Sequence, residues 1–365
     1  MTKIKHIVIS LVMAAFFLSF SLFAWVKPSD EFSESERRKL SQPPELSMST
    51  ILSGDFMSNF ENYTLDQFPL RDKFRTLKAL VTLNIFNQSA NNDIYVADGF
   101  ASKIEYPLNE ASVRRAGDRF RYVYEKYLKD KNTKNYLCVI PDKNYFLAEA
   151  NGYLSLDYDK MLEELTDNTD FLQYIDITND LEISDYYKTD THWRQEKLVP
   201  IAEKIGDAMG TDVTSRYEEN ELENDFYGVY YGQSALPLEG EKIKYLTNST
   251  LDNCKAYDYQ NHKEMPVYHM EKAVGKDPYE MYLGGPLSLV TIENEQAKTD
   301  KELIIFRDSF GSAIAPLLAE GYSKITLVDI RYIHPDVIGN YIEFDSRDVL
   351  FLYSTSVLNN SETIK

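Results

Sequence analysis

Three polar residues of this 365-residue chain could supply the nucleophile, base and carboxylate of an acyl-transfer site: Ser309, His192 and Asp190. A serine hydroxyl is a poor nucleophile until an imidazole accepts its proton, and the imidazole needs a carboxylate to fix its tautomer. The spacing of Asp190 and His192 can place both side chains on one side of an extended turn. From spacing alone, Ser309 could equally cap the helix that follows it.

The chain has five histidines, so few residues are candidates for the general base. His192 stands beside both a carboxylate and Trp193, whose ring is expected to pack beneath this turn as a support. His262, His269 and His334 are expected to be ordinary surface or core residues, and the one remaining histidine is His6.

Short apolar runs separated by helical stretches predict a parallel sheet with helices on both faces. In one βαβ unit, the run 303–306 leads directly into Ser309, and Gly321 ends the helix before the next strand. Ligands of such sheets bind at the carboxyl ends of the strands, where the loop carrying His192 is also expected. The expected strands cover residues 136–140, 174–177, 303–306, 325–328 and 349–353.

Residues 7–26 are almost entirely apolar and would span about 30 Å as a helix, enough to cross a bilayer. Lys3 and Lys5 precede the segment and favour an N-in orientation, with the bulk of the chain extracytoplasmic. Residues 21–25 lack a clean small-x-small cleavage site, which favours an uncleaved signal anchor over a cleaved signal peptide. A single-pass cell-membrane protein is therefore expected.

The rest of the chain is expected to form a linker (27–50) and a catalytic domain (51–365). Within that domain, residues 56–86 predict two short amphipathic helices broken at Pro69. Residues 211–300 are acidic and rich in tyrosine and turn signals, and are interpreted as an insertion of mixed structure.

Composition excludes several classes of function. The net charge of −19 repels phosphate backbones, so nucleic acid binding is not expected. Two cysteines, Cys138 and Cys254, cannot make a disulfide framework, although one bond between them stays open. No cofactor and no metal are expected.

The run Asp190-Thr191-His192-Trp193 and the strand-to-helix segment 306–311 together resemble the DHHW family and the wider SGNH-like proteins that O-acetylate alginate and other exopolysaccharides. Similar segments cover most of residues 30–355. Two residues depart from the pattern: Thr191 replaces the second His, and Arg307 stands where SGNH esterases have Gly. The supporting segments are 32–40, 61–71, 141–143 and 328–332.

The resemblance implies an SGNH-hydrolase-like (flavodoxin-like) α/β fold and an extracytoplasmic O-acetyltransferase acting on a cell-surface or secreted polysaccharide. Ser309 would carry the acetyl group, His192 would be the base, and Asp190 would orient His192. A membrane-bound O-acyltransferase partner would supply the acetyl donor. Two alternatives stay open: a carbohydrate esterase with the same triad, and a non-catalytic glycan-binding subunit of a polysaccharide export complex.

Further residues are candidates for binding substrate or the oxyanion. Arg331, Tyr145 and Lys143 follow expected strands and could contact the substrate. The backbone N–H of Ser309 is one candidate oxyanion donor. Gly285 is a second, because glycine permits unusual backbone angles, but Gly284-Gly285-Pro286 could equally be a simple turn.

Overall fold

A computed structural model describes residues 2–365, with the side chains described from Ile4 onward, so the predicted flanking role of Lys3 lies outside the described side chains. The chain divides into two units, one of residues 2–92 with 231–237 and one of residues 93–230 with 238–365. Residues 51–92, which the sequence assigns to the catalytic domain, thus group with the apolar N-terminal helix.

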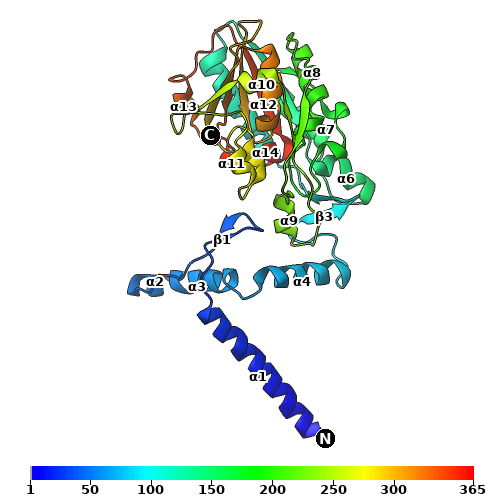
Figure 1. Ribbon diagram of the computed structural model, residues 1–365, viewed down its shortest axis with the longest axis vertical. Helices are drawn as coiled ribbons and strands as arrows, with labels where there is room; N and C mark the ends of the chain where they lie inside the picture. The colour runs from blue at the N-terminus through cyan, green and yellow to red at the C-terminus, as the bar shows by residue number, and fades with distance from the viewer. Residues whose placement is uncertain (1) are drawn as a thin grey trace. The chain divides into compact units, whose positions relative to one another are not determined.

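The larger unit is built on a sheet flanked by helices (Figure 1). The sheet has eight strands in the order β10-β9-β11-β13-β12-β14-β5-β6. The strands from β13 to β6 run parallel, which confirms the predicted parallel sheet. These strands are β5 (Lys134–Ile140), β6 (Gln173–Tyr174), β12 (Glu302–Arg307), β13 (Lys324–Val328) and β14 (Asp348–Ser354).

The 211–300 segment completes this sheet, which the sequence did not reveal. Its strands β11, β9 and β10 extend the edge beyond β13, each antiparallel to its neighbour. The elements of the segment are β7 (Glu218–Glu221), α9 (Val229–Ser234), β8 (Lys244–Thr247), α10 (Ser249–Asn253), β9 (Lys255–Asp258), β10 (Lys263–Met265), α11 (Met270–Ala273) and β11 (Leu289–Glu293).

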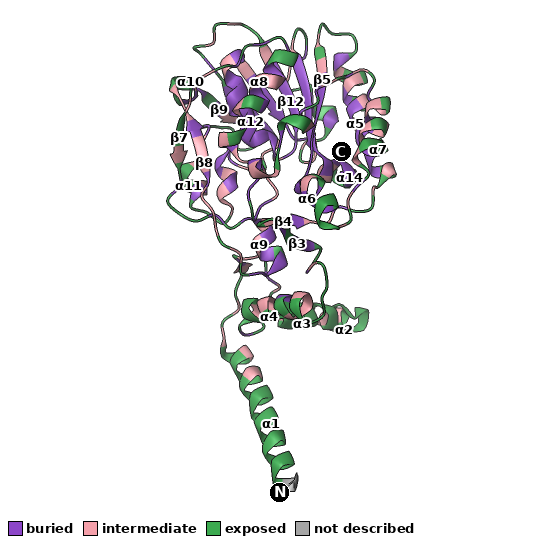
Figure 2. Ribbon diagram, turned by 90° about the vertical axis from the view of Figure 1, so that its right-hand side faces the viewer, coloured by how far each residue is buried: buried purple, intermediate pink, exposed green. Residues whose placement is uncertain are grey.

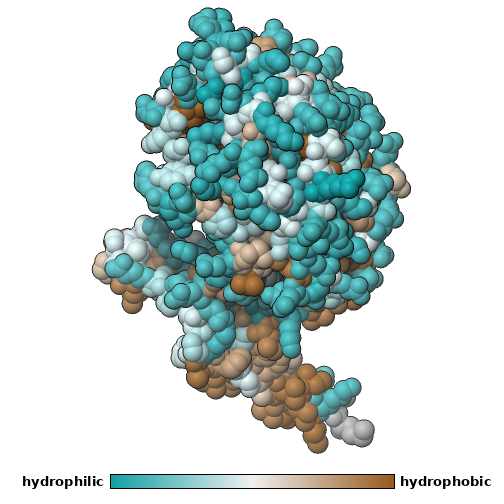
Figure 3. Space-filling model, turned by 45° about the horizontal axis from the view of Figure 1, so that its top comes forward, coloured by the Kyte–Doolittle hydropathy of each residue, from teal (hydrophilic) through white to brown (hydrophobic). Residues whose placement is uncertain are grey.

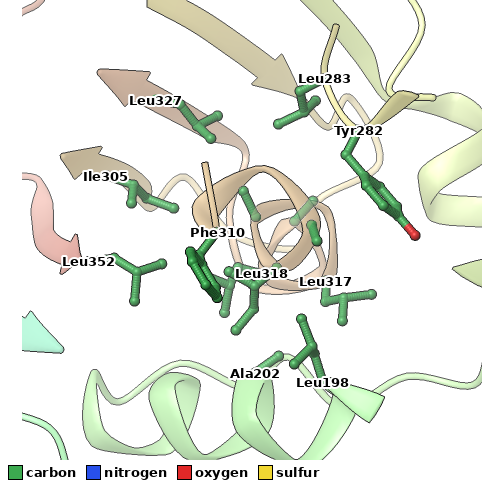
Figure 4. Close-up of a cluster of buried hydrophobic side chains, with 14 of the residues drawn as sticks. Leu198, Ala202, Tyr282, Leu283, Ile305, Phe310, Leu317, Leu318, Leu327 and Leu352 are labelled. Atoms are coloured by element: carbon green, nitrogen blue, oxygen red, sulfur yellow. The ribbon is translucent and has the colours of Figure 1, made fainter. Parts of the chain in front are cut away.

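Helices cover both faces of the sheet because alternate strand residues point to opposite sides. On one face, Ile305 and Leu352 pack with α8 (Val199–Ala208) and α12 (Gly311–Leu318), as Figure 4 shows. On the other face, Phe306 and Phe351 pack beneath the second group of helices. That group comprises α5 (Glu110–Val123), α7 (Tyr158–Asn168), α13 (Pro335–Ile338) and α14 (Thr355–Asn359).

The central strands are buried along most of their length, as the purple ribbons of Figure 2 show. Both cysteines are buried free thiols, so no bond joins them. The remaining elements of the larger unit are β3 (Ile94–Ala97), β4 (Phe100–Lys103), a π-helical turn (Tyr124–Leu128) and α6 (Lys143–Asn151).

The smaller unit begins with α1 (Thr2–Val26), whose apolar window contains no buried residue. Among the described residues it is the one helix long and apolar enough to cross a membrane, with a mean hydropathy of 2.5 over its best window. The two helices predicted on either side of Pro69 are confirmed as α3 and α4. The elements that follow α1 are β1 (Phe32–Ser33), β2 (Arg38–Lys39), α2 (Met48–Ser53), α3 (Asp55–Asp66) and α4 (Arg71–Asn84).

The packing of β12 predicts a large loss of stability when Ile305 is shortened. Ile305 is fully buried in the strand that leads to Ser309. We expect Ile305→Ala to lower the free energy of unfolding by about 2–5 kcal/mol, because the removed atoms leave a cavity. Val337→Ala, at a position that is 41% exposed, should change it by less than about 0.5 kcal/mol. Denaturant unfolding measures both, and equal effects would contradict this packing.

Candidate active site

Ser309 lies on the turn between β12 and α12, at the carboxyl edge of the sheet. The buried carboxylate of Asp308 holds this turn. Its Oδ1 accepts a hydrogen bond from the Phe310 N–H at 3.0 Å, and its Oδ2 accepts two from Ser354, at 2.8 Å from N and 2.7 Å from Oγ. Because Ser354 ends β14, the nucleophile turn is fastened to the neighbouring strand.

Asp190 and His192 lie on a loop whose two ends pair with each other. Tyr186 and Trp193 form an isolated antiparallel bridge, and the Tyr187 N–H donates to the His192 carbonyl at 3.1 Å. Trp193 is fully buried, and its indole N–H donates to the Phe310 carbonyl at 3.1 Å. The predicted support by Trp193 is confirmed, and it joins this loop to the serine turn.

The structure brings Ser309, His192 and Asp190 into one chain of hydrogen bonds. His192 Nε2 lies 2.8 Å from Ser309 Oγ, and His192 Nδ1 lies 2.6 Å from Asp190 Oδ1. Ser309 does not cap α12, because the N-cap residue is Phe310 and it makes no side-chain cap. The carboxylate is nearly fully buried, while the imidazole is 12% exposed. This arrangement can move a proton from the hydroxyl to the imidazole.

The insertion fixes the second oxygen of the Asp190 carboxylate. The Val229 N–H donates to Asp190 Oδ2 at 2.8 Å, and the Gly228 N–H donates to the Thr189 hydroxyl at 2.9 Å. A Cβ on Gly228 would come within 2.3 Å of the Asp190 Cβ, so only glycine fits here. The 211–300 segment therefore forms part of the site.

Tyr279, also in the insertion, is a site residue that the sequence did not identify. Its ring stacks on the His192 imidazole, with centroids 3.9 Å apart and an interplanar angle of 11°. Burial raises the pKa of its hydroxyl well above the usual range, so the ring stays neutral beside the base. An electron-rich face stabilises a protonated imidazole. Only the abundance of tyrosine in the segment hinted at such a contact.

Lys143 lies beneath the loop, although the sequence placed it against the substrate. Its side chain is buried, and its ammonium donates to the carbonyls of Tyr187 at 2.9 Å and Lys188 at 3.1 Å. The ring of Tyr230 lies 5.0 Å away. Burial lowers the pKa of Lys143 to about 7, while the negative charges of Asp190 and Glu241 oppose that shift. The position suits support of the loop.

Arg331 forms an ion pair with the carboxylate of Asp329. Its guanidinium makes a two-pronged contact with buried Asp329, at 2.9 Å from Nε and 2.6 Å from Nη2. Arg307, the departure from the SGNH pattern, lies 3.7 Å from the same carboxylate and is fully buried. A Cβ on Gly311 would come within 2.7 Å of the Arg307 Cβ, so the first turn of α12 packs directly over this side chain.

Tyr145 lines a pocket and Gly285 lies in a turn, and neither belongs to the hydrogen-bonded triad. Tyr145 is 40% exposed and lines a pocket of about 200 Å³ together with Tyr158, Tyr174 and Asp176. Gly285 has a left-handed backbone (φ 82°), and its N–H donates to the Tyr282 carbonyl at 3.3 Å within its own turn. That donor is therefore already engaged. Among residues 2–365, no three His, Cys, Asp or Glu side chains gather as a metal site.

The buried ammonium predicts a pH-dependent stability. Between about pH 7 and pH 10.4 the unfolded chain holds a proton on Lys143 that the folded chain has lost, so wild-type stability rises with pH by up to about 1.4 kcal/mol per pH unit. Lys143→Met removes this gain. We expect the difference in unfolding free energy, wild type minus variant, to increase from pH 7 to pH 9.5.

The control is Lys129→Met, at an exposed lysine. The difference in unfolding free energy between wild type and this variant should stay constant over the same pH range. A level difference for Lys143→Met as well would show that the buried ammonium is not deprotonated in the folded protein.

Known proteins resemble this chain in structure and not in sequence. No family model and no curated protein matches the sequence. A DHHW family protein from Eubacterium siraeum superposes with a TM-score of 0.60 at 21% identity, covering 75% of this chain and 95% of that one. Bacillus cereus PatB1 with a sulfonyl adduct gives 0.57 at 20% identity, covering 73% and 97%. The chain therefore shares its fold with these two proteins, as its resemblance to the DHHW family implied.

Proposed function

We propose that this protein is an O-acetyltransferase that passes acetyl groups to a polysaccharide through an acetyl-Ser309 intermediate. The observation that carries the proposal is the unbroken chain of hydrogen bonds from Asp190 through His192 to Ser309. A binding module has no need of a buried carboxylate, an imidazole and a hydroxyl in that order.

The first half-reaction loads the enzyme. His192 Nε2 takes the Ser309 proton while Oγ attacks the carbonyl carbon of the acetyl donor. The bond from that carbon to the donor breaks, and the departing group takes the proton from His192. The buried Asp190 carboxylate stabilises the imidazolium formed in between, and Tyr279 stacks against it.

The second half-reaction regenerates the serine. A sugar hydroxyl gives its proton to His192 Nε2, and its oxygen attacks the acetyl carbon. The ester bond to Ser309 breaks, and Oγ recovers the proton. The Ser309 N–H is our proposed oxyanion donor. Gly285 is a weaker candidate because its N–H is bonded within its own turn.

Two parts of the proposal rest on the resemblance to the DHHW family: that the transferred group is acetyl, and that the acceptor is a polysaccharide. PatB1, which resembles this chain in fold, carries a sulfonyl adduct in its solved structure, and a sulfonyl group is one that activated serines accept. Arg331, whose side chain remains 16% exposed while it binds Asp329, and the Tyr145 pocket are proposed to contact sugar, with Lys143 assigned instead to loop support. We propose that the catalytic unit faces out of the cytoplasm and receives acetyl from a membrane-bound O-acyltransferase.

An esterase is the second candidate, because the imidazole is 12% exposed and water can reach it. The two candidates share the first half-reaction and differ in which hydroxyl enters the second. They are told apart by whether added oligosaccharide or water receives the acetyl group.

Removal of the nucleophile should abolish turnover. We expect Ser309→Ala to lower the hydrolysis of p-nitrophenyl acetate by as much as about 10⁶-fold, as is typical when a triad loses its nucleophile. The same variant should resist labelling by a sulfonyl fluoride that modifies the wild type. Ser312→Ala changes another serine of this segment and should retain both properties. Activity in Ser309→Ala equal to that of Ser312→Ala would exclude the mechanism.

The Asp190 carboxylate should affect kcat because it selects the tautomer of His192. Asp190→Asn keeps the size of the side chain but can donate a proton toward Nδ1, which leaves Nε2 unable to accept from Ser309. We expect kcat to fall by about 10⁴-fold with little change in KM. Asp207→Asn, at an exposed position of α8, serves as the matched control. An unchanged kcat in Asp190→Asn would remove Asp190 from the mechanism.

A further inference from the structure

Helix α4 exposes a stripe of large apolar side chains. Leu70, Phe74, Leu77, Leu80 and Ile85, which we call the apolar stripe, are between 38% and 68% exposed. From Leu70 to Leu80 they are spaced three or four residues apart, which places them along one side of the helix, and Ile85 follows at its C-cap. Soluble proteins rarely leave such a continuous surface in water, so the stripe indicates a binding surface.

The opposite side of α4 is covered. Ala79 is buried there, and Arg75 donates to the Gly232 carbonyl at 2.7 Å and pairs with Glu36 at 3.2 Å. The helix is therefore held by its polar side within its own unit. Only the apolar stripe remains available for a further partner.

The stripe continues onto the membrane-length helix. The ring of Phe20, in α1, lies 5.8 Å from the ring of Phe68 and 5.9 Å from that of Phe74. Helices α2, α3 and α4 lie in one layer across the end of α1 in both Figure 1 and Figure 2. A hollow of about 570 Å³ between α1 and α3 is lined mainly by aromatic rings, including Phe16, Trp25 and Phe60.

Charge and hydropathy on this unit differ from the rest of the chain. Residues 27–92 carry eight Lys or Arg and nine Asp or Glu, so they are nearly neutral while the whole chain has a net charge of −19. Lys73 and Lys78 flank the apolar stripe, where their stems can lie on an apolar surface and their ammonium groups can reach phosphates. Figure 3 shows hydrophobic surface along α1 and around its base.

We propose that the apolar stripe of α4 lies in the headgroup region of the bilayer that α1 crosses, so that α2–α4 form a membrane-parallel platform. The occupant is lipid, because the stripe joins α1, whose length and hydropathy suit a bilayer, and because this unit lacks the acidic excess that anionic headgroups would repel. The platform would hold residues 85–92, which follow α4, close to the membrane surface.

The test uses the full chain in phospholipid nanodiscs containing a fraction of anionic lipid. Both buried cysteines are replaced by alanine, and a nitroxide is attached at Leu77→Cys or at Leu80→Cys. Thr82→Cys, on the covered side of α4, is the matched control. Collision of the label with oxygen, which concentrates in lipid, is compared with collision with a water-soluble nickel chelate. Thermal unfolding checks that each labelled chain is folded.

We expect labels at Leu77 and Leu80 to favour oxygen and to lie about 5–10 Å below the phosphate level. The label at Thr82, on the covered side, should show no preference for oxygen. Free access of nickel to all three sites would place the stripe in water and overturn the proposal. Exclusion of both agents from Leu77, with line broadening between labels, would assign the stripe to a second copy of the chain and also overturn it.

A second pair of variants guards against effects of the label. Leu77→Trp and Thr82→Trp are compared for quenching by lipids brominated near the top of the acyl chains. Strong quenching of the tryptophan at 77 alone supports the proposal. Equal quenching at the two positions contradicts it.

Discussion

The hydrogen bonds of one buried carboxylate, Asp308, fix where the candidate nucleophile stands. Its two oxygens bind the start of α12 through Phe310 and the end of β14 through Ser354. Ser309 lies between these fastened points. A buried carboxylate is costly unless its oxygens are hydrogen-bonded, so the serine turn and β14 stabilise each other. The nucleophile is thereby positioned by the sheet.

The base and its carboxylate are held by contacts of the same kind from three other directions. Lys143 donates to the carbonyls that precede Asp190, Val229 donates to the carboxylate itself, and Trp193 ties the loop to Phe310. These contacts reach the loop from the first helix after β5, from the insertion and from the serine turn. Preorganisation of this kind lets the groups react without first moving into place.

Much of the architecture could be predicted from sequence because it depends on local patterns. The apolar runs predicted four of the five parallel strands, while the fifth, predicted over 174–177, is observed as Gln173–Tyr174. Pro69 predicted the break between α3 and α4, and the strand-to-helix position of Ser309 predicted its edge of the sheet. The Asp-x-His spacing grouped Asp190 with His192, but pairing them with Ser309 relied on the resemblance to the DHHW family.

The remainder could not be predicted because it depends on contacts between distant parts of the chain. Tyr279 lies in a single 3-10 turn (Pro278–Met281) and Gly228 in a loop, and neither is long enough for periodicity to show which side chain faces His192 or Asp190. Lys143 looked like a cleft residue because it follows a strand, yet its stem points under the loop. The edge strands β9–β11 gave no clear signal, since their pairing depends on β13.

The central claim is that acetyl passes through Ser309 on its way to a sugar. The most direct measurement is a rapid-quench experiment with isotopically labelled acetyl donor, followed by intact mass and peptide mapping. The account predicts one acetyl on Ser309 that forms within the first turnover and leaves faster when oligosaccharide is added, with the label appearing on the sugar. Transfer of label to sugar without any acetyl-Ser309, or label on another residue, would contradict it.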